Sequence, residues 1–403
     1  MNIFSFLRRR KPIPEPWAKY YTKEELNIKI PDISMYDQVK KSAHLYPEYI
    51  AYEYMGKKCL YKDLLNEINA WAKIFSKSGV KHGDIVSISL PNIPNVLIVL
   101  YALNKIGAIA NMVHPLSSEE EILFSLNSTK SKYLVMLNTF YSKIENIIDN
   151  SKVEAVIFAS ASDYMPFFTK FAYNITQIGK YKKYPKNNLF YSWKKFYKKY
   201  YTEEHIKFPK FGKDTPAVII HSGGTSGTPK NVVIQNRAFI LGALQENILM
   251  KKLHPGDCCL AIMPNFHGFG LSVLMHTPLA LGCYSILIPQ FDSKKFDIMF
   301  HKKKPSCVLG VPTLYEALMG NNNIKNLDLS NLKYIVSGGD ILPKSLEDRM
   351  NKYLKEHNSP GKITQGYGLS EALAAVCLAC DDINKSGSVG IPLPGNQIKI
   401  IDP

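Results

Sequence analysis

A run of nine residues combines glycine, hydroxyl and lysine side chains in a pattern suited to phosphate binding. It is Ser222-Gly223-Gly224-Thr225-Ser226-Gly227-Thr228-Pro229-Lys230, and it follows the apolar residues 217–220. Glycines let the backbone approach a polyphosphate, hydroxyl and amide groups donate to its oxygens, and a lysine adds positive charge. The run is not a Walker A loop, because Pro229 precedes the lysine and no hydroxyl follows it. We therefore expect a phosphate-binding loop of another type, with a flexible surface loop as the alternative.

A second motif adds groups that suit the rest of a nucleotide. It reads Gln365-Gly366-Tyr367-Gly368-Leu369-Ser370-Glu371. The ring of Tyr367 could stack on a purine, and Glu371 offers a hard oxygen ligand for Mg²⁺ bound to phosphates. The alternative is a tight turn around a core tyrosine, followed by a helix cap.

Three further segments place glycine or polar residues where we expect apolar strands to end. They are Val336-Ser337-Gly338-Gly339-Asp340, Pro264-Asn265-Phe266-His267-Gly268-Phe269-Gly270 and Gly310-Val311-Pro312-Thr313. Each alone fits an ordinary turn, and a solitary histidine is more often structural than catalytic. Ligand sites in open α/β sheets form outside the carboxyl ends of strands, so the segments together predict one shared site.

The elements that must position these motifs alternate between helix and strand. Two α/β layers are expected, the first from 61 to 159 and the second from 217 to 337, each a mostly parallel sheet covered by helices. The first layer includes expected helices at 61–78, 95–106, 118–127 and 141–150, and strands at 85–90, 109–113, 133–137 and 155–159. The second includes expected helices at 236–249 and 270–281, and strands at 217–220, 259–263, 285–288, 307–310 and 334–337.

The expected division of the chain has four parts. They are a basic N-terminal extension at 1–34, a first α/β subdomain with a linker at 35–210, a second α/β subdomain with the site at 211–385, and the start of a small β-rich unit at 386–403. The linker is the segment 174–215, rich in Lys, Tyr and Pro, and the last unit includes an expected strand at 397–401. Because the chain ends two residues after that strand, we expect it to be truncated.

Composition limits the class of protein. The net charge is +16, and a dense basic and aromatic cluster lies between Tyr181 and Tyr201. No nucleic-acid module surrounds this cluster, so we interpret it as a solvated helix and loop rather than a nucleic-acid surface. No apolar run is long enough to span a bilayer, the N-terminus does not resemble a secretory signal, and seven scattered cysteines suit a reducing compartment. A cytoplasmic protein is expected.

Taken in order, the motifs resemble those of the adenylate-forming superfamily, and within it the AMP-forming acyl-CoA synthetases, particularly fatty-acid CoA ligases. The resemblance begins near Tyr36 and also includes Gly387-Ser388-Val389-Gly390-Ile391-Pro392-Leu393-Pro394-Gly395. It implies a large N-terminal domain that uses ATP, Mg²⁺ and CoA. In the implied reaction, a carboxylate attacks the α-phosphate of ATP to give an acyl-adenylate and pyrophosphate, and the CoA thiol then displaces AMP.

The resemblance also implies roles for individual residues. Thr225, Lys230, His267 and Glu371 would be catalytic, and Glu371 would hold the metal. The acid would contact His267, Gly268, Val311, Pro312 and Gly338. The residues implied to bind ATP are Ser222, Gly223, Gly224, Thr225, Ser226, Gly227, Thr228, Lys230, Gly338, Gly339, Asp340, Gln365, Gly366, Tyr367, Gly368 and Ser370.

Several departures and alternatives stay open at this point. Asn231 stands where the family usually has glycine, and Ser370 stands where it usually has threonine. The family's ribose-binding aspartate, hinge and mobile C-terminal domain would follow Pro403, so we expect this chain to catalyse poorly by itself. The alternatives are an enzyme that loads a carrier protein, an enzyme that activates an aryl acid, and a silent nucleotide-binding module. A homodimer and a membrane contact through the basic residues 8–11 at the inner face of the membrane are also open, and a disordered basic tail is the competing interpretation.

Overall fold

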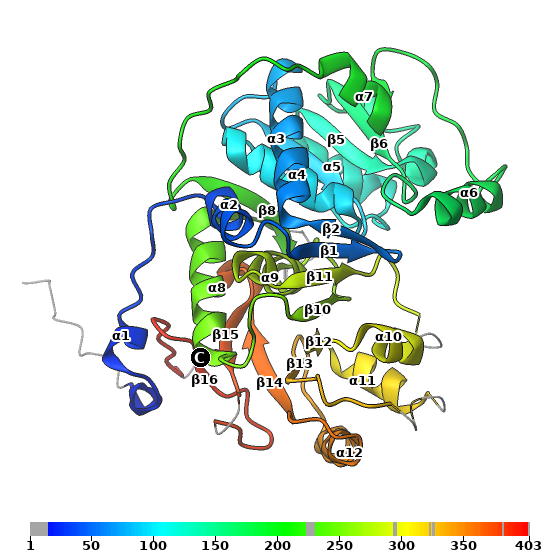
Figure 1. Cartoon of the computed structure of the whole chain (residues 1–403). Coiled ribbons are helices and arrows are strands. Elements are labelled where there is room, and N and C mark those ends of the chain that lie inside the picture. Colours follow the sequence, from blue (N-terminus) through cyan, green and yellow to red (C-terminus); the bar gives the residue numbers. More distant parts are fainter. Residues whose placement is uncertain are drawn as a thin grey trace, which may run out of the picture.

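Two stacked sheets form the framework of the molecule (Figure 1). The computed structural model describes residues 15–222, 230–292, 296–321, 324, 327–380 and 383–401. The expected α/β architecture with two mostly parallel sheets is confirmed.

The first sheet has seven strands, and six of them run parallel. β5 and β6 are apolar at every position and buried throughout, as expected for parallel strands covered on both faces. Only β9 is antiparallel. It pairs with β8, and the phosphate-loop motif runs from the end of β8 to the start of β9. In spatial order the strands are β7 (Phe190–Ser192), β6 (Ala155–Ala159), β5 (Tyr133–Leu137), β3 (Ile85–Ser89), β4 (Ile109–Met112), β8 (Pro216–Ser222) and β9 (Lys230–Gln235).

The second sheet has nine strands with a parallel centre and antiparallel edges. The antiparallel pairs are β1–β2 at one edge, and β14–β15 and β15–β16 at the other. In spatial order the strands are β16 (Ile391–Pro392), β15 (Ala375–Leu378), β14 (Ile363–Gly368), β13 (Tyr334–Ser337), β12 (Cys307–Gly310), β10 (Cys258–Ala261), β11 (Tyr284–Leu287), β1 (Ile50–Tyr54) and β2 (Lys57–Leu60).

Helices pack between and outside the sheets. α4 is apolar on nearly all sides, begins with Pro94 in its first turn and ends at Gly107, which has a left-handed φ of 74°. Such a helix must be buried, and it belongs to the core that joins both sheets. The helices are α1 (Lys23–Leu26), α2 (Met35–Leu45), α3 (Tyr61–Lys77), α4 (Pro94–Ile106), α5 (Glu119–Thr129), α6 (Phe167–Thr176), α7 (Trp193–Tyr200), α8 (Asn236–Leu249), α9 (Thr277–Ala280), α10 (Phe296–Lys303), α11 (Pro312–Met319) and α12 (Lys344–Glu356).

Two outer cores complete the layers. Residues of β10 to β14 pack with α11 and α12 in one of them, and residues of β5 and β6 pack with α5 in the other. Figure 1 shows α10, α11 and α12 beside the second sheet, and α3, α4 and α7 beside the first. The site motifs therefore sit at strand ends held on both faces by packed helices.

Several expected elements differ in the structure. The helix expected at 141–150 is replaced by two short 3-10 turns, Asn138–Lys143 and Ile148–Asn150. The expected helix at 270–281 is a π-helical segment, Phe269–His276, that continues into α9. No strand forms over the described residues 397–401, because no strand in the described chain pairs with them. The expected linker at 174–215 contains β7 and α7.

Strand exchange links the two halves of the chain. β1 and β2 belong to the second sheet, where β1 pairs with β11, and β8 belongs to the first sheet, where it pairs with β4. Pairing thus crosses residue 210 in both directions, and the four-part division stays a prediction. Among the described residues, no helix is long and apolar enough to cross a bilayer.

Candidate functional site

The base of the phosphate-loop motif is a paired hairpin. Ser222 at the end of β8 lies opposite Lys230 at the start of β9, and His221 lies opposite Asn231. Ser222 is half-buried and Lys230 is exposed. The predicted residues Gly223, Gly224, Thr225, Ser226, Gly227 and Thr228 lie outside the described residues. The hairpin therefore sets where the motif begins and ends.

A buried polar network supports this hairpin from beneath. Nε2 of His221 lies 2.8 Å from Oδ1 of Asn111 and 3.0 Å from Oγ of Ser125. Burial lowers the pKa of the His221 imidazole, so the ring is neutral at pH 7. The side chain of Asn231 donates to Oγ of Ser128 at 3.0 Å. Asn231 stands where the family usually has glycine, and its hydrogen bond to Ser128 gives this side chain a structural role.

The second motif lies beside the same hairpin. β14 ends at Gly368, and the 3-10 turn Ser370–Ala372 that follows packs next to β8 and β9. Tyr367 is 50% exposed, so its ring is accessible to a planar ligand. Glu371 is exposed on the turn. The structure therefore brings the carboxylate and the aromatic ring to the edge where the phosphate-loop motif emerges.

The glycine pair after β13 lies between two other motifs. The N–H of Gly338 donates to the carbonyl oxygen of Gly310 at 2.9 Å. A Cβ on Gly338 would lie 3.5 Å from the carbonyl oxygen of Gly366, and one on Gly339 would lie 3.3 Å from Cγ1 of Val311. The ends of β12, β13 and β14 thus form one continuous wall.

Other predicted residues belong to this wall or lie at its edge. Gln365 is buried in β14, and its carbonyl oxygen accepts a hydrogen bond from the N–H of Ala379. Pro312 is buried in the first turn of α11. Asp340 is exposed, and its carboxylate accepts a hydrogen bond from the N–H of Ile341.

The histidine segment meets the second motif through backbone contact. A Cβ on Gly268 would lie 1.4 Å from the carbonyl oxygen of Leu373, so only glycine fits there. Leu373 itself has a left-handed φ of 70° where the chain leaves the 3-10 turn. The His267 ring is reachable by solvent, yet the protein around it lowers its pKa by desolvation. At pH 7 it is neutral and can accept or donate one hydrogen bond.

A second histidine, not singled out from the sequence, lies close to His267. The ring of His114 packs against that of Phe266 with centroids 4.1 Å apart. Desolvation lowers the pKa of His114, Glu121 opposes this shift, and His267 adds to it. The signal was available, because His114 follows the apolar strand at 109–113 and so lies at a strand end like the other motifs.

Two asparagines tie the sheets together beneath the site. Asn92, after β3, donates to the carbonyl oxygens of Ala261 and Met263, both at 2.9 Å. The side-chain oxygen Oδ1 of Asn92 accepts from the backbone N–H of Asn265 at 3.1 Å and from the side-chain amide of Asn265 at 3.0 Å. All these groups are buried or nearly so, and the pair holds the histidine segment against the first sheet.

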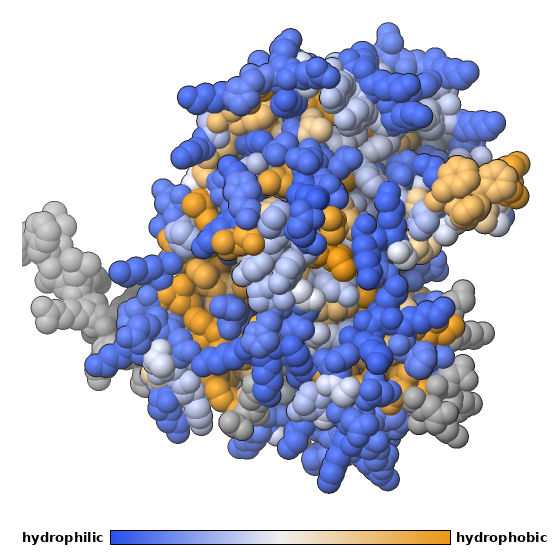
Figure 2. Space-filling view, viewed as in Figure 1, coloured by the Kyte–Doolittle hydropathy of each residue, from blue (hydrophilic) through white to orange (hydrophobic). Residues whose placement is uncertain are grey.

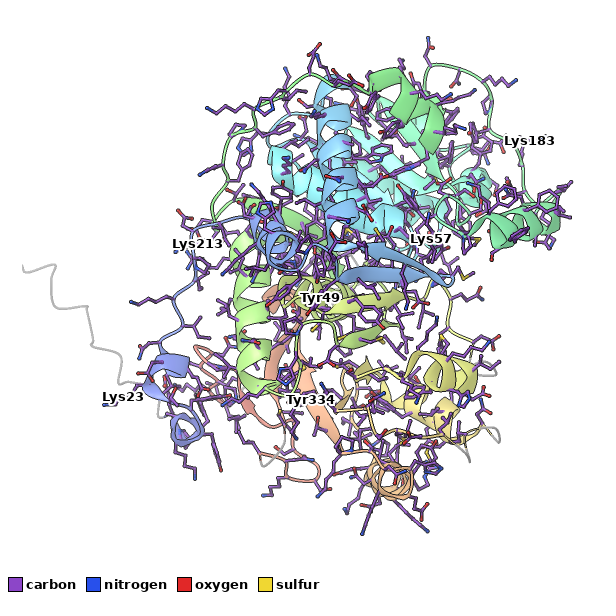
Figure 3. The ribbon with its side chains drawn as sticks, in the orientation of Figure 1. Lys23, Tyr49, Lys57, Lys183, Lys213 and Tyr334 are labelled. Atoms are coloured by element: carbon purple, nitrogen blue, oxygen red, sulfur yellow. The ribbon has the colours of Figure 1, made fainter. Side chains whose placement is uncertain are left out.

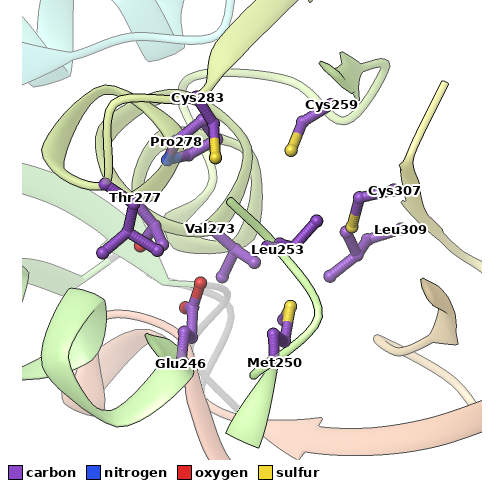
Figure 4. Close-up of a pocket in the computed structure, with 11 residues that line it drawn as sticks. Glu246, Met250, Leu253, Cys259, Val273, Thr277, Pro278, Cys283, Cys307 and Leu309 are labelled. Carbon is purple, nitrogen blue, oxygen red and sulfur yellow. The ribbon is translucent and has the colours of Figure 1, made fainter. Parts of the chain in front are cut away.

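A small apolar pocket lies deeper along the same elements (Figure 4). Val273, in the segment that begins after Gly268, lines it, as does Leu309, which directly precedes Gly310. One wall carries Glu246, which is 4% exposed, and burial raises its pKa to about 8. Thr277 lies near this carboxyl, but its hydroxyl makes no hydrogen bond within the described chain. The pocket therefore presents a neutral carboxylic acid among apolar side chains at pH 7.

Comparison with known proteins reveals a family match over nearly the whole chain. The profile of the family described as "AMP-binding enzyme" matches residues 39–403. A long-chain-fatty-acid–CoA ligase of Bacillus subtilis is 28% identical over 96% of this chain and 69% of its own length. A 4-coumarate:CoA ligase of Petunia hybrida is 25% identical over 87% of this chain and 62% of its own length. The chain thus spans about two thirds of these relatives.

Solved structures share the fold. A long-chain-fatty-acid-CoA ligase from Archaeoglobus fulgidus superposes with a TM-score of 0.76 at 21% identity, over 91% of this chain and 70% of that one. An anthranilate CoA ligase in complex with anthranoyl-AMP superposes with a TM-score of 0.79 at 20% identity, over 94% of this chain and 68% of that one. These comparisons agree with the predicted superfamily and with an AMP-forming acid–CoA ligase.

Proposed function

Because this chain belongs to the AMP-binding enzyme family, we propose that it carries most of the site of an ATP-dependent ligase that joins a fatty acid to CoA. One observation carries the proposal. The two strands that flank the phosphate-loop motif, the Tyr367–Glu371 turn, the Gly338–Gly339 pair and the histidine segment meet at one edge of the stacked sheets. These are the groups that an acid, a nucleotide and a metal ion need within reach of one another.

The nucleotide would lie across the turn and the hairpin. Tyr367 would stack on adenine, while Ser370 and Lys230 would face the phosphates together with the motif that Ser222 begins. Mg²⁺ fits here because the exposed carboxylate of Glu371 is a hard ligand placed beside the phosphate hairpin. When bound, the ion would neutralise charge on the phosphates.

The acid would approach from the histidine side. His267 and His114 are neutral hydrogen-bonding groups whose desolvated surroundings suit a carboxylate that must be held without losing its nucleophilicity. Gly268, Val311, Pro312 and Gly338 would shape the channel. The choice of a fatty acid is supported by the similarity to long-chain-fatty-acid–CoA ligases.

The acyl acceptor and the cellular location are also proposals. Transfer of the acyl group to the CoA thiol follows from the similarity to acid–CoA ligases. A cytoplasmic location is supported by seven cysteines scattered through the chain, which suit a reducing compartment. A homodimer and a membrane contact at residues 8–11 stay predictions, and those N-terminal residues lie outside the described residues.

Pyrophosphate exchange tests the first step. ATP, Mg²⁺ and labelled pyrophosphate are incubated with saturated fatty acids of increasing length, and with 4-coumarate and anthranilate in parallel. We expect exchange to rise with apolar tail length. Faster exchange with the aryl acids would show that the substrate is an aryl acid and not a fatty acid. No exchange with any acid, by this chain or a longer form, would contradict the proposed activity.

Two variants with matched controls test the site. Tyr367→Ala should raise the KM for ATP about tenfold through lost stacking, whereas Tyr201→Ala, with a ring exposed to a similar extent, should not. Glu371→Gln should lower kcat about a hundredfold and raise the Mg²⁺ requirement, whereas Glu203→Gln on the exposed surface should leave both unchanged. If a variant and its control had the same kinetic constants, the substituted residue would not belong to the site.

A further inference from the structure

The apolar face of α6 is turned away from the protein. Five large apolar side chains are between 52% and 84% exposed, and they are Phe167, Phe168, Phe171, Ile175 and Ile178. At 100° per residue the four that belong to α6 fall within one face of the helix, because their spacing follows i, i+1, i+4 and i+8, and Ile178 lies in the turn just after the helix. Figure 2 shows this apolar surface projecting from the body of the molecule. We call these five residues the α6 face.

The described part of the chain does not cover this face. No residue of α6 is buried, and only the half-buried Tyr173 packs against the core. Isolated exposed apolar residues are normal in proteins, but a contiguous face of this size marks an interaction surface.

The chain around the α6 face is strongly basic. Residues 164–202 contain nine lysines and no aspartate or glutamate. Lys180, Lys183 and Lys186 are exposed on the loop that leads from α6 to α7, and Figure 3 shows Lys183 on this loop. An apolar face flanked by lysines is typical of helices that lie in the interface of an anionic bilayer.

We propose that α6 and the lysine loop dock this protein on an anionic lipid surface. The α6 face would lie among the lipid acyl chains, and Lys180, Lys183 and Lys186 would contact the lipid phosphates. A second copy of the chain is a poorer occupant, because each copy would bring the same nine lysines and a net charge of +16 to the contact.

The position of α6 relative to the site gives this docking a use. The helix follows the carboxyl end of β6, and the phosphate hairpin follows the carboxyl end of β8 in the same sheet. Four strand steps separate β6 from β8, which is about 19 Å at 4.8 Å per step. A docked molecule would thus hold its site edge near a surface in which fatty acids dissolve. The docking itself does not depend on the proposed ligase activity.

Vesicle sedimentation tests the proposal without any activity measurement. The full chain is mixed with vesicles of phosphatidylcholine alone or of equal parts phosphatidylcholine and phosphatidylglycerol. We expect binding to the mixed vesicles that weakens as salt is added. Equal binding to both compositions, or no binding to the mixed vesicles, would overturn the proposal.

Two sets of variants separate the apolar and basic contributions. Phe167→Ser/Phe168→Ser/Phe171→Ser should lower the partition coefficient by about tenfold or more, and Lys180→Glu/Lys183→Glu/Lys186→Glu should abolish the preference for anionic vesicles. The control, Leu45→Ser/Ile298→Ser, removes exposed apolar side chains elsewhere and should bind like the original chain. Because no residue of α6 is buried, the serine variant should keep its melting temperature.

Sedimentation velocity tests whether a second copy of the chain, and not a lipid surface, covers the α6 face. If the serine variant turned a dimer into a monomer and still bound vesicles normally, the α6 face would be a contact between copies, and the lipid proposal would be wrong.

Discussion

The buried carboxyl of Glu246 makes stability depend on pH in a way that one substitution should remove. Glu246 lies on α8 against the apolar pocket, and burial raises its pKa from 4.5 to about 8. Since the folded-state pKa is the higher one, the folded protein keeps a proton that the unfolded chain releases above about pH 4.5. The free energy of unfolding therefore falls as the pH rises from about 4.5 to about 8, and then levels off.

The size of this effect follows from the two pKa values. The interval between 4.5 and about 8 corresponds to about 5 kcal/mol at about 1.36 kcal/mol per pH unit. With an unfolding entropy of about 2.1 cal/mol/K per residue, a chain of 403 residues would shift its melting temperature by about 6 °C. The substitution Glu246→Gln keeps the shape of the side chain and cannot ionise, so it removes this dependence.

Thermal melts at about pH 5, 6, 7 and 8 provide the assay. The melting temperature of Glu246→Gln minus that of the original chain should rise by about 4 °C across this range, because part of the full effect lies below pH 5 and above pH 8. Burial of the amide adds an offset that does not change with pH. Glu203→Gln, at an exposed position, is the control and should show no such trend. A difference for Glu246→Gln that stays flat with pH would show that the carboxyl is not held protonated, and the reasoning would be refuted.

Three other predictions concern the site wall and the buried polar core. Gly268→Ala should cost more than tenfold in pyrophosphate exchange because its Cβ would overlap the carbonyl oxygen of Leu373, whereas Gly242→Ala, with its nearest atom at 3.5 Å, should stay within about threefold; similar rates for the two variants would contradict the close contact at Gly268. Asn92→Ala should destabilise the fold by about 2–4 kcal/mol in urea unfolding, since it removes one hydrogen bond from each of two carbonyl groups and one from a buried N–H; a loss below about 0.5 kcal/mol would be inconsistent with its bridging role. His276, whose pKa burial lowers to about 3, is neutral when folded, so stability should fall by about 1.4 kcal/mol per pH unit as the pH drops below 6.5; His276→Gln should flatten that slope in acid melts, and an unchanged slope would exclude the assignment.

Local sequence predicted many elements well where local forces decide them. The bounds of β5, β6, β12, β13 and α8 agree with expectation, because an apolar run or a helical period bounded by turn residues is sufficient to define them. The expected helix at 141–150 was wrong for a local reason. Tyr141, Ile144 and Ile148 are buried at the expected spacing, but Tyr141 and Ile148 lie in separate 3-10 turns and Ile144 lies in the turn between them, so burial at this spacing did not require an α-helix.

The strand expected at 397–401 was wrong for a reason that lies outside the segment. Its alternating pattern suits a strand, but a strand needs a partner to satisfy its backbone, and the described chain provides none there. The same limit explains why the membership of β1 and β2 in the second sheet was not foreseen, since β2 joins it through β1, and the strand β11 that pairs with β1 is more than two hundred residues away.

The sequence by itself determined the chemistry of this protein: the types, spacing and order of its motifs, and from these the family to which it belongs. Tertiary structure decided which of those groups meet. It placed His114 beside Phe266, pressed Gly268 against Leu373, enclosed Glu246 beside an apolar pocket and left the α6 face uncovered by any other described residues. Each of these relations depends on segments that are distant in the chain or on the absence of a neighbour, and periodicity within one segment carries no information about either.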